Sequence, residues 1–510
     1  MILVDLRLVF RVGLFYVLYK IYRLENMDKS IDFFKDKNIL VVGLGRTGAS
    51  VIEKMHGLSR SLVGVDRNPS LHLEDNFKKY KKAERKNIKI FLGSDINQNK
   101  KLLNDIDLII ISPGVPNEIP LIKHAEKAEI PIWSELELSW KLMTDVEKRN
   151  TIAVTGTNGK TTVVTLIGEI LKNYGIGTRV CGNIGNPLID TVCLNGKNKA
   201  IISGNGNRPE IRVIEVSSFQ LERIYDFKPF IAVILNITSD HVDRHRDMEN
   251  YIDLKFRLAL KQSPDDYTVI NADDENINKK LAANNYYKNI KSNLIKYSSN
   301  FNKDADIYNR GGDIFYRVCK KNGKIDIRDA SLKGEHNVSN IMACIAAAKL
   351  YNIDDESIRA TLKNFKPLEH RLEYLGTISQ IRCYNDSKST NPDATVKALS
   401  NFDREVTLIL GGLDKGMDFS SLIPVLNQKV NSLLLVGESS AKINNMLKNV
   451  DHGYRIYRCK TLDEAVKVGF KVTRPGHVLL LSPSCASMDM FKDYKERGER
   501  FRRLVMGNKF

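Results

Sequence analysis

The segment Thr155 to Thr161, with the sequence TGTNGKT, constrains the fold of this chain more than any other stretch. It follows the apolar run Thr151 to Val154 and opens an apolar-periodic stretch from Thr162 to Tyr174, which predicts a strand, a glycine turn and a helix. Backbone N–H groups in such a turn, together with the positive end of the helix dipole, bind phosphate oxygens. We therefore expect a phosphate chain to bind at this turn.

Two side chains sharpen this interpretation. Lys160 supplies a point charge for the phosphates, and the hydroxyl of Thr161 is placed to ligate an accompanying Mg²⁺. The spacing is two residues shorter than the Walker A pattern G-x-x-x-x-G-K-[ST], so the ordinary P-loop geometry does not transfer directly. A Gly-Asn-Gly turn that merely joins a strand to a helix is the alternative.

Composition sets the broad class of the protein. The chain has 510 residues, 42% of them hydrophobic and 27% charged, which predicts a globular protein with about three domains. The net charge is +17, but the lysines are spread along the chain and no nucleic-acid module is recognisable, so we expect anionic small molecules as partners and no nucleic acid. The seven cysteines are scattered and never spaced as C-x-x-C, which argues against disulfides and zinc and favours a reducing cytoplasm.

The first 30 residues are apolar but interrupted by charges, and their only sizeable uncharged run is Val12 to Tyr19. A spanning helix needs about 20 apolar residues, so this segment is not expected to cross a membrane. It is either a basic amphipathic helix on a membrane surface or an extension that precedes a true start at Met27. Membrane contact is possible but not expected.

From Asn38 onward, strands alternate with helices. NILVVG, a glycine turn and SLVGVD form the first βαβ unit of a doubly wound domain. Gly43, Gly45 and Gly48 give the dinucleotide fingerprint G-x-G-x-x-G, and Asp66 follows about twenty residues later. Alone, this pattern indicates NAD, but a UDP group offers the same phosphate and ribose to the turn.

In the middle of the chain, polar residues follow buried strands, which is where parallel sheets bind ligands. RVIEVSS places Glu215 at the carboxyl end of one strand, and FIAVILNIT runs into Asp240, His241 and Asp243. With Thr161 these residues form a candidate Mg²⁺ site, because Mg²⁺ takes oxygen ligands and keeps several waters.

The remaining chain completes the predicted layout. The polar region from Asp274 to about Lys333 is expected to cover a sheet edge, and the helix from about His336 to Leu350 to be buried packing. After it, six apolar strands alternate with helices in another doubly wound sheet. The loops NDSKST and GGLDKG follow two of these strands, where function is expected.

Ten motifs occur along the chain in a fixed order: GLGRTG, TGTNGKT, GNIG, EVSSFQLE, NITSDHVDRH, GEHNVSN, LEHRLE, NDSKSTNP, GGLDKG and LLSPSCASMDMFKDYKERG. Their order and spacing from Asn38 to the C-terminus resemble the Mur ligases of peptidoglycan synthesis. The resemblance implies an α/β protein with an N-terminal extension (1–30), a Rossmann-like UDP-binding domain (31–133), a central P-loop ATPase-type domain (134–367) and a Rossmann-like C-terminal domain (368–510) that closes over the site.

The resemblance also implies the chemistry. ATP and Mg²⁺ would drive amide formation between the carboxylate of UDP-N-acetylmuramoyl-L-alanine and the amine of D-glutamate, in the cytoplasm, and we expect a monomer. Phosphorylation by the γ-phosphate turns the carboxylate into an acyl phosphate with a good leaving group, and the amine then attacks through a tetrahedral intermediate. Catalysis is mainly charge neutralisation and alignment.

Motif matching carries the family's roles to individual residues. Catalytic roles fall on Lys160, Glu215, His241 and Lys255. ATP contacts fall on Gly156, Thr157, Asn158, Gly159, Lys160, Thr161, Thr162, Asn271, Arg371, Asp386 and Lys388. The UDP substrate is implied for Thr47, Asp66, Gly114, Asn183 and Ser217, and D-glutamate for Thr390, Lys415, Ser487 and Tyr494.

The resemblance further implies two Mg²⁺ ions, one on Thr161 and Glu215 and one on His241 with Lys255 as a carbamate. Tyr251, Leu254 and Leu258 share an apolar helical face with Lys255. An apolar setting favours the neutral amine, which takes up CO₂ and becomes an anion suited to Mg²⁺. A lysine whose stem covers the core is the alternative.

Three other classes of protein share some of these motifs, and each departs from this sequence in a specific way. Mur ligases that add meso-diaminopimelate carry Asp-Asn-Pro-Arg in the last domain, which this chain lacks, and GGLDKG with SCAS favours glutamate over L-alanine or a diamino acid. Folylpolyglutamate synthetases lack the preceding nucleotide-sugar domain, which Gly43 to Ser134 forms here. A nicotinamide-dependent oxidoreductase or nucleotide sensor would leave TGTNGKT, Glu215 and His241 unexplained.

A chain that starts at Met27 is expected to keep full ligase activity, because the first fold-forming strand begins only near Asn38. The measurement compares the turnover of the full and shortened chains, with circular dichroism as the control for folding. Lost turnover in a folded, shortened chain would show that the extension belongs to the active enzyme.

Overall fold

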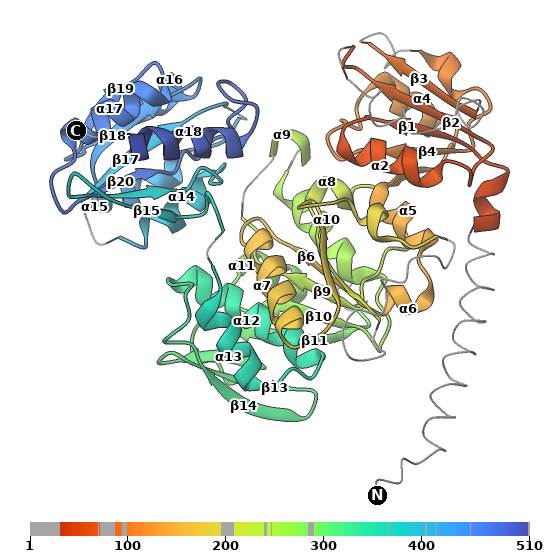
Figure 1. Ribbon diagram of the computed structural model, residues 1–510, viewed down its shortest axis with the longest axis horizontal. Coiled ribbons are helices and arrows are strands. Elements are labelled where there is room, and N and C mark those ends of the chain that lie inside the picture. The colour runs from red at the N-terminus through yellow and green to blue at the C-terminus, as the bar shows by residue number, and fades with distance from the viewer. Residues whose placement is uncertain are drawn as a thin grey trace, which may run out of the picture.

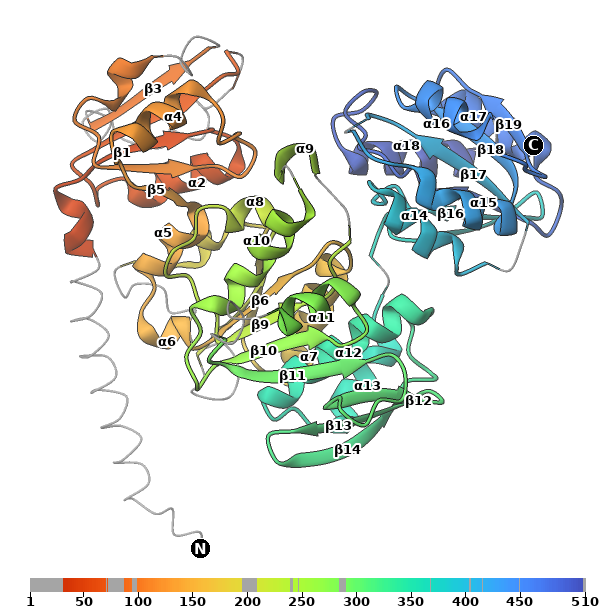
Figure 2. The ribbon, with the colours of Figure 1, turned by 180° about the vertical axis from the view of Figure 1, so that it is seen from behind.

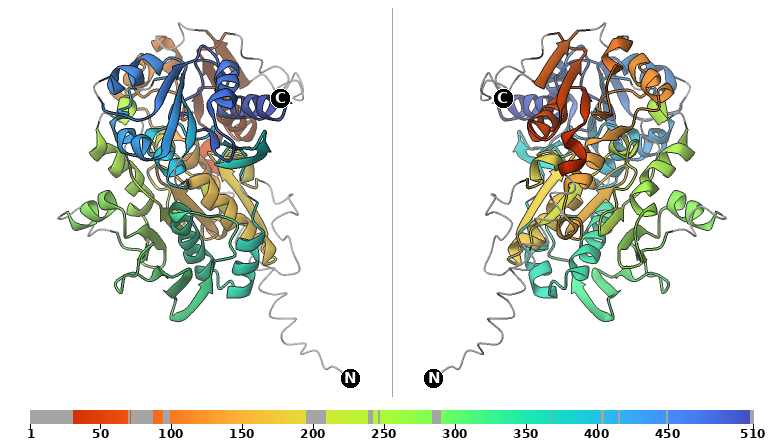
Figure 3. Two further views of the ribbon diagram at one scale, coloured as in Figure 1. Left: turned by 90° about the vertical axis from the view of Figure 1, so that its left-hand side faces the viewer. Right: turned by 90° about the vertical axis from the view of Figure 1, so that its right-hand side faces the viewer.

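Three α/β domains follow one another along the chain (Figure 1). The N-terminal and C-terminal domains lie at the same end of the central domain in all views (Figures 2 and 3). The predicted α/β architecture of three domains is therefore confirmed. The computed structural model describes residues 31–69, 71, 87–93, 99–194, 209–238, 242–245, 247–283, 290–366, 368–402, 405–414, 416–448 and 450–507, and the predicted extension 1–30 lies outside them.

The N-terminal domain contains a five-stranded parallel sheet in the order β3-β2-β1-β4-β5. Its central strands are buried runs, NILVV and LIII, because helices pack on both faces. The predicted doubly wound unit is thus observed. The elements are β1 (Asn38–Val42), α2 (Arg46–Met55), β2 (Ser61–Asp66), β3 (Ile88–Leu92), η3 (Lys100–Leu103), β4 (Leu108–Ile111), α4 (Pro120–Lys127) and β5 (Ile132–Ser134).

The central domain begins with two helices and contains a nine-stranded sheet in the order β14-β13-β12-β11-β10-β9-β6-β8-β7. Neighbouring strands are parallel from β7 to β12 and antiparallel from β12 to β14. The polar region that we expected to cover an edge contributes β11 to β14, so it extends the sheet at that edge. The strands are β6 (Thr151–Thr155), β7 (Thr178–Gly182), β8 (Ile211–Glu215), β9 (Ile231–Ile234), β10 (Tyr267–Asn271), β11 (Asn293–Ser298), β12 (Ile307–Arg310), β13 (Asp313–Val318) and β14 (Lys321–Asp326).

Helices of the central domain cover both faces of this sheet (Figures 1 and 2). The small apolar residues of α12 pack against α7, as the sequence predicts for this helix. The helices are α5 (Glu135–Leu142), α6 (Asp145–Lys148), α7 (Lys160–Asn173), η4 (Leu188–Thr191), α8 (Ser218–Leu221), α9 (Val242–His245), α10 (Met248–Leu260), α11 (Glu275–Ala282), α12 (Glu335–Leu350) and α13 (Asp355–Asn364).

The C-terminal domain contains a six-stranded sheet in the order β15-β16-β20-β17-β18-β19, parallel except for β15. This matches the predicted second doubly wound sheet. The elements are β15 (Glu373–Ile378), β16 (Ile381–Asn385), α14 (Pro392–Leu399), β17 (Val406–Gly411), η7 (Ser420–Leu422), α15 (Ile423–Lys429), β18 (Val430–Val436), α16 (Ser440–Leu447), β19 (Arg455–Arg458), α17 (Leu462–Val472), β20 (Val478–Leu481) and α18 (Tyr494–Gly507).

The domains are joined in two different ways. One hydrophobic cluster combines Val41 and Val51 of the N-terminal domain with Ile189, Ile214 and other residues of the central domain. The C-terminal domain has two clusters of its own, and no cluster among the described residues joins it to the central domain. The first two domains therefore share a core, whereas the third meets the central domain through polar contacts.

All seven cysteines are free thiols, and six of them are buried. Within the part of the chain that the structure describes, no helix has the length and apolar character needed to cross a membrane.

Candidate active site

The predicted phosphate loop lies between β6 and α7. Gly156 and Gly159 have φ values of 151° and 87°, a region of backbone conformation that favours glycine. A Cβ atom on Gly159 would also overlap the side-chain oxygen of Asn340 on α12. The helix begins at Lys160, two residues before the apolar-periodic stretch, so its first N–H groups open onto the loop.

Two side chains hold the loop in shape. The ammonium of Lys160 donates to the carbonyls of Gly156 at 2.7 Å and Thr157 at 2.8 Å, which keeps the charge over the loop. From the end of β9, the side chain of Asn236 accepts from the backbone N–H of Asn158 at 2.8 Å and donates to its carbonyl at 3.0 Å.

Glu215 is the last residue of β8, as the sequence predicts, and its side chain is 3% exposed. Its Oε1 accepts from the Asn183 side chain at 2.8 Å, whereas its buried Oε2 has no hydrogen-bond donor among the described residues. A buried carboxylate is costly unless a cation or donors compensate it. An oxygen ligand of this kind, in the same site as the Thr161 hydroxyl, fits Mg²⁺.

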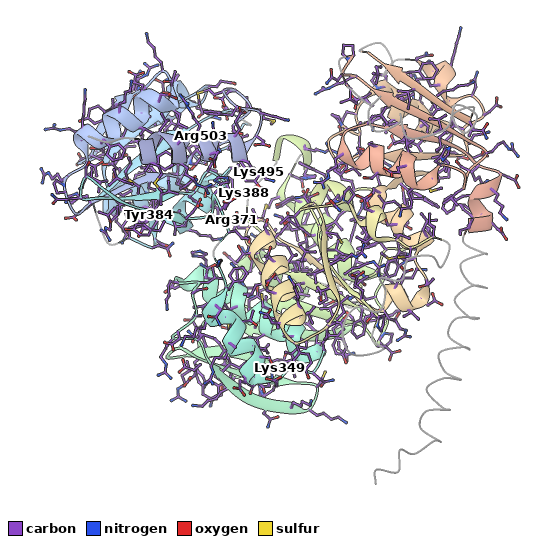
Figure 4. The ribbon with its side chains drawn as sticks, viewed as in Figure 1. Lys349, Arg371, Tyr384, Lys388, Lys495 and Arg503 are labelled. Atoms are coloured by element: carbon purple, nitrogen blue, oxygen red, sulfur yellow. The ribbon has the colours of Figure 1, made fainter. Side chains whose placement is uncertain are left out.

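The C-terminal domain adds cationic side chains to this site. Arg371 donates from Nη2 to the hydroxyl oxygen of Thr161, and Lys388 lies 3.8 Å from the centre of the Tyr494 ring. Figure 4 shows Arg371 and Lys388 on the side of this domain that faces the central domain. The site therefore lies between the two domains.

Burial changes the proton affinity of these groups. Burial, together with the nearby charges of Arg371 and Lys160, lowers the pKa of Lys388 to about 7, against the opposing effect of Glu215. Burial also raises the pKa of Asp386 to about 6, although hydrogen bonds from Ser389, Ser482 and the Leu372 N–H oppose this change. The pKa of Arg371 is lowered by burial.

A cavity of about 460 Å³ adjoins the loop and is lined by residues of both domains. Asn271, at the end of β10, and Thr162 line it, and the sequence analysis assigns both to the nucleotide. His336 and Asn337 at the start of α12 and Lys397 on α14 also line it, and sequence reasoning missed them. The polar motif GEHNVSN before the apolar part of α12 was the available signal. Burial and Lys397 lower the pKa of His336 to about 4, so its imidazole is neutral near pH 7.

Comparison with known proteins identifies the family. Three family models match this chain: the Mur ligase MurD-like N-terminal domain at 37–134, the Mur ligase middle domain at 154–348 and the Mur ligase glutamate ligase domain at 370–485. A UDP-N-acetylmuramoylalanine–D-glutamate ligase of Clostridioides difficile is 38% identical over 469 residues, which cover 92% of this chain and 98% of that protein. The chain belongs to the Mur ligase family.

Further similarities agree with this membership. The ligase of the same name from Citrifermentans bemidjiense is 38% identical over 93% of this chain and 98% of its own. Among solved structures, the UDP-N-acetylmuramate-alanine ligase MurC of Thermotoga maritima has a TM-score of 0.54 at 19% identity, covering 93% of this chain and 100% of that one. MurF of the same organism, solved with ADP, has a TM-score of 0.53 at 14% identity, covering 93% and 96%. These structures share the fold of this Mur ligase.

The residues predicted for UDP lie at one edge of the N-terminal sheet of this Mur ligase. Thr47 is in the first turn of α2, and Gly114 is in an exposed turn after β4. Asp66 ends β2, and its carboxylate accepts from the backbone N–H groups of Leu44 at 2.7 Å and Asn68 at 2.9 Å. Asp66 therefore stabilises the glycine turn itself.

The other two residues predicted for the UDP-linked substrate, Ser217 and Asn183, contact protein groups. Ser217 is the N-cap of α8, and its hydroxyl lies 3.0 Å from the Gln220 side-chain oxygen and accepts from the Gln220 N–H at 3.4 Å. Asn183 donates to Glu215. Both lie beside the phosphate-loop edge of the central sheet, where the sequence predicts them.

The predicted second metal site is only partly described. His241 lies outside the described residues, as do Asp240 and Lys415. Lys255 on α10 is 1% exposed, and its Nζ lies 4.3 Å from the centre of the Tyr251 ring. The Tyr251 hydroxyl is 3.2 Å from the hydroxyl of Thr157 in the phosphate loop. Lys255 is thus buried beside the loop.

The described residues predicted for D-glutamate lie in the C-terminal domain. Thr390 precedes α14, Tyr494 begins α18, and Ser487 is 3% exposed in the loop after β20. Tyr494 contacts Lys388, so the predicted acceptor and nucleotide residues are adjacent in this domain.

Binding of ADP at pH 8 is expected to take up about one proton, because phosphate oxygens near Lys388 would stabilise an ammonium whose pKa is about 7 without them. At pH 6 the ammonium is already charged, so uptake should approach zero. Calorimetry in two buffers of different ionisation enthalpy measures this quantity, and Lys388→Met is the control. Equal uptake by the variant and the wild type at pH 8 would contradict the assignment.

Proposed function

We propose that this Mur ligase is an ATP-dependent enzyme that joins D-glutamate to UDP-N-acetylmuramoyl-L-alanine in cytoplasmic peptidoglycan precursor synthesis. The names of the curated relatives support this substrate pair, and the cover of nearly their whole length supports the complete reaction. In this proposal the enzyme is a monomer, binds no nucleic acid and needs no contact with a membrane.

One observation carries the reaction type. The Oε2 of buried Glu215, which no donor among the described residues reaches, lies in a site whose cations, Lys160, Arg371 and Lys388, come from two domains. Phosphoryl transfer to a carboxylate builds negative charge on both the phosphoryl and the acyl oxygens. Preorganised cations at that point stabilise the transition state, and closing domains exclude water from the acyl phosphate.

Mg²⁺ would be held by Thr161 and Glu215, and a second ion by His241 with a carbamylated Lys255. When bound, such ions neutralise phosphate charge and orient the phosphoryl group. The protein side chains act beside these ions. In the proposed mechanism Lys160 and the loop N–H groups bind the phosphates, and Arg371, Asp386 and Lys388 approach from the closing domain. Asn271 and the loop residues Gly156 to Thr162 would hold the rest of ATP.

We assign the UDP-linked substrate to Thr47, Asp66, Gly114, Asn183 and Ser217, and D-glutamate to Thr390, Lys415, Ser487 and Tyr494. The tyrosine ring and Lys388 would bring the acceptor amine to the phosphorylated carboxylate. The Ser217 hydroxyl already donates to Gln220, and the Asn183 amide already donates to Glu215. On substrate binding either these hydrogen bonds break, or the substrate contacts only the other atoms of Ser217 and Asn183.

Phosphate release from ATP is expected to require both UDP-N-acetylmuramoyl-L-alanine and D-glutamate. Lys160→Ala should lower turnover about a thousandfold, because a preorganised charge at a transferring phosphoryl group is worth several kcal/mol. The assay measures phosphate with each substrate omitted in turn. Activity with L-alanine or a diamino acid in place of D-glutamate, or near-normal turnover of Lys160→Ala, would refute the proposal.

Lys255→Ala is expected to lose activity and to recover part of it in acetate, whose carboxylate could replace the carbamate anion in the vacated space. The readout is turnover against acetate concentration, with chloride as the salt control. Full activity of the alanine variant without added acid would mean that Lys255 only packs against Tyr251.

A further inference from the structure

The closing domain meets the phosphate loop through the side chain of Asp393. This residue lies in the first turn of α14, just after the loop of Lys388 and Thr390. Its Oδ2 accepts from the side chain of Asn158 at 2.5 Å and from the hydroxyl of Thr238 at 3.0 Å, both in the central domain. One carboxylate oxygen thus bridges two domains.

Both partners are tied to the phosphate loop. Asn158 is inside the loop, and its backbone is held by Asn236. The backbone N–H of Thr238 donates to the Thr157 hydroxyl at 3.0 Å, and that hydroxyl lies 3.0 Å from the Thr238 carbonyl. A displacement of Asp393 would therefore reach the loop directly at Asn158 and through Thr238 at Thr157.

The carboxylate also has a local partner. Lys397, one turn along α14, donates to the same oxygen at 2.8 Å. An i,i+4 pair on a helix surface stabilises by only a few tenths of a kcal/mol and needs no second domain. The two additional donors from the central domain exceed what a helix-surface pair explains.

The hydrogen bonds of Asp393 contribute to the stability of the interface between the central and C-terminal domains. Among the described residues no hydrophobic cluster joins the central and C-terminal domains, so hydrogen bonds such as those of Asp393 and Arg371 contribute much of the contact between them. Hydrogen bonds to an ionised acceptor are about twice as strong as neutral ones. Asp393 is 26% exposed, so water competes only partly for its oxygens.

We propose that Asp393 is a positioning residue that couples the phosphate loop to the closing domain. By holding the start of α14 on Asn158 and Thr238, it keeps the preceding loop, with Lys388 and Thr390, at the site of phosphoryl and acyl transfer. The catalytic part of this inference rests on the proposed function, whereas the docking of the two domains does not.

The first test is a double-mutant cycle with Asp393→Asn and Thr238→Val. Asparagine removes the charge at nearly constant size, and valine removes the hydroxyl donor while keeping the shape. Each variant should lower kcat about tenfold or more, with the Kd for ATP changed less than about twofold, because neither Asp393 nor Thr238 lines the cavity beside the loop. The double variant should lose little beyond Asp393→Asn alone.

Asp463→Asn is the matched control. Asp463 lies in the first turn of α17 in the same domain and pairs with Arg500 on α18, so it shares the helix position and the ion pair but lacks a contact to the central domain among the described residues. Its kcat should equal that of the wild type. Additive losses in the cycle, or an equal loss in Asp463→Asn, would overturn the proposed coupling.

The second test does not need the ligase reaction. Small-angle X-ray scattering of the full chain with Mg²⁺ and a non-hydrolysable ATP analogue should give a larger radius of gyration for Asp393→Asn and Thr238→Val than for the wild type. Faster amide exchange in the peptide that holds Thr155 to Thr161 should accompany it. Unchanged scattering and exchange in both folded variants would overturn the inference, even if the acceptor proves not to be D-glutamate.

Discussion

The buried Oε2 of Glu215, which accepts no hydrogen bond from the part of the chain that the structure describes, is the constraint on which the rest of the site depends. A carboxylate oxygen in a buried position, with its partner oxygen taken by Asn183, leaves negative charge that the fold does not neutralise by direct contact. The cations nearby have other contacts: Lys160 donates to loop carbonyls, and Lys388 lies over the Tyr494 ring. The same burial explains why the pKa of Lys388 falls and that of Asp386 rises. A bound cation and a phosphate chain would satisfy these groups together.

The local parts of this site could be predicted from the sequence. Glu215 ends β8, and Gly156 and Gly159 form a glycine turn. Both features were predictable because apolar runs and glycines determine the backbone conformation close to them in sequence. The family membership followed from motifs that keep their order along the chain. The βαβ unit predicted for the first sheet is also observed, since β1 and β2 pair in parallel from Asn38 with Ser61 to Val42 with Val65.

Contacts between distant segments could not be predicted in this way. Asn158 and Asp393 are 235 residues apart, and nothing in the helical spacing of α14 indicates that its first acidic residue faces another domain. His336 was read as the start of a buried helix because the apolar residues after it dominate the periodicity. The hydrogen bonds of Ser217 are likewise invisible in sequence, since a capping serine and a ligand-binding serine look alike.

The shared core of the first two domains has a consequence for how such an enzyme can change over time. Val51 and Ile189 pack in one cluster, so a substitution there changes the packing of the N-terminal and central domains together. The C-terminal domain keeps its own cores and touches the loop through a few polar side chains. Substitutions inside it can therefore accumulate without disturbing the core that the first two domains share, as long as Arg371, Lys388 and Asp393 keep their places beside the loop.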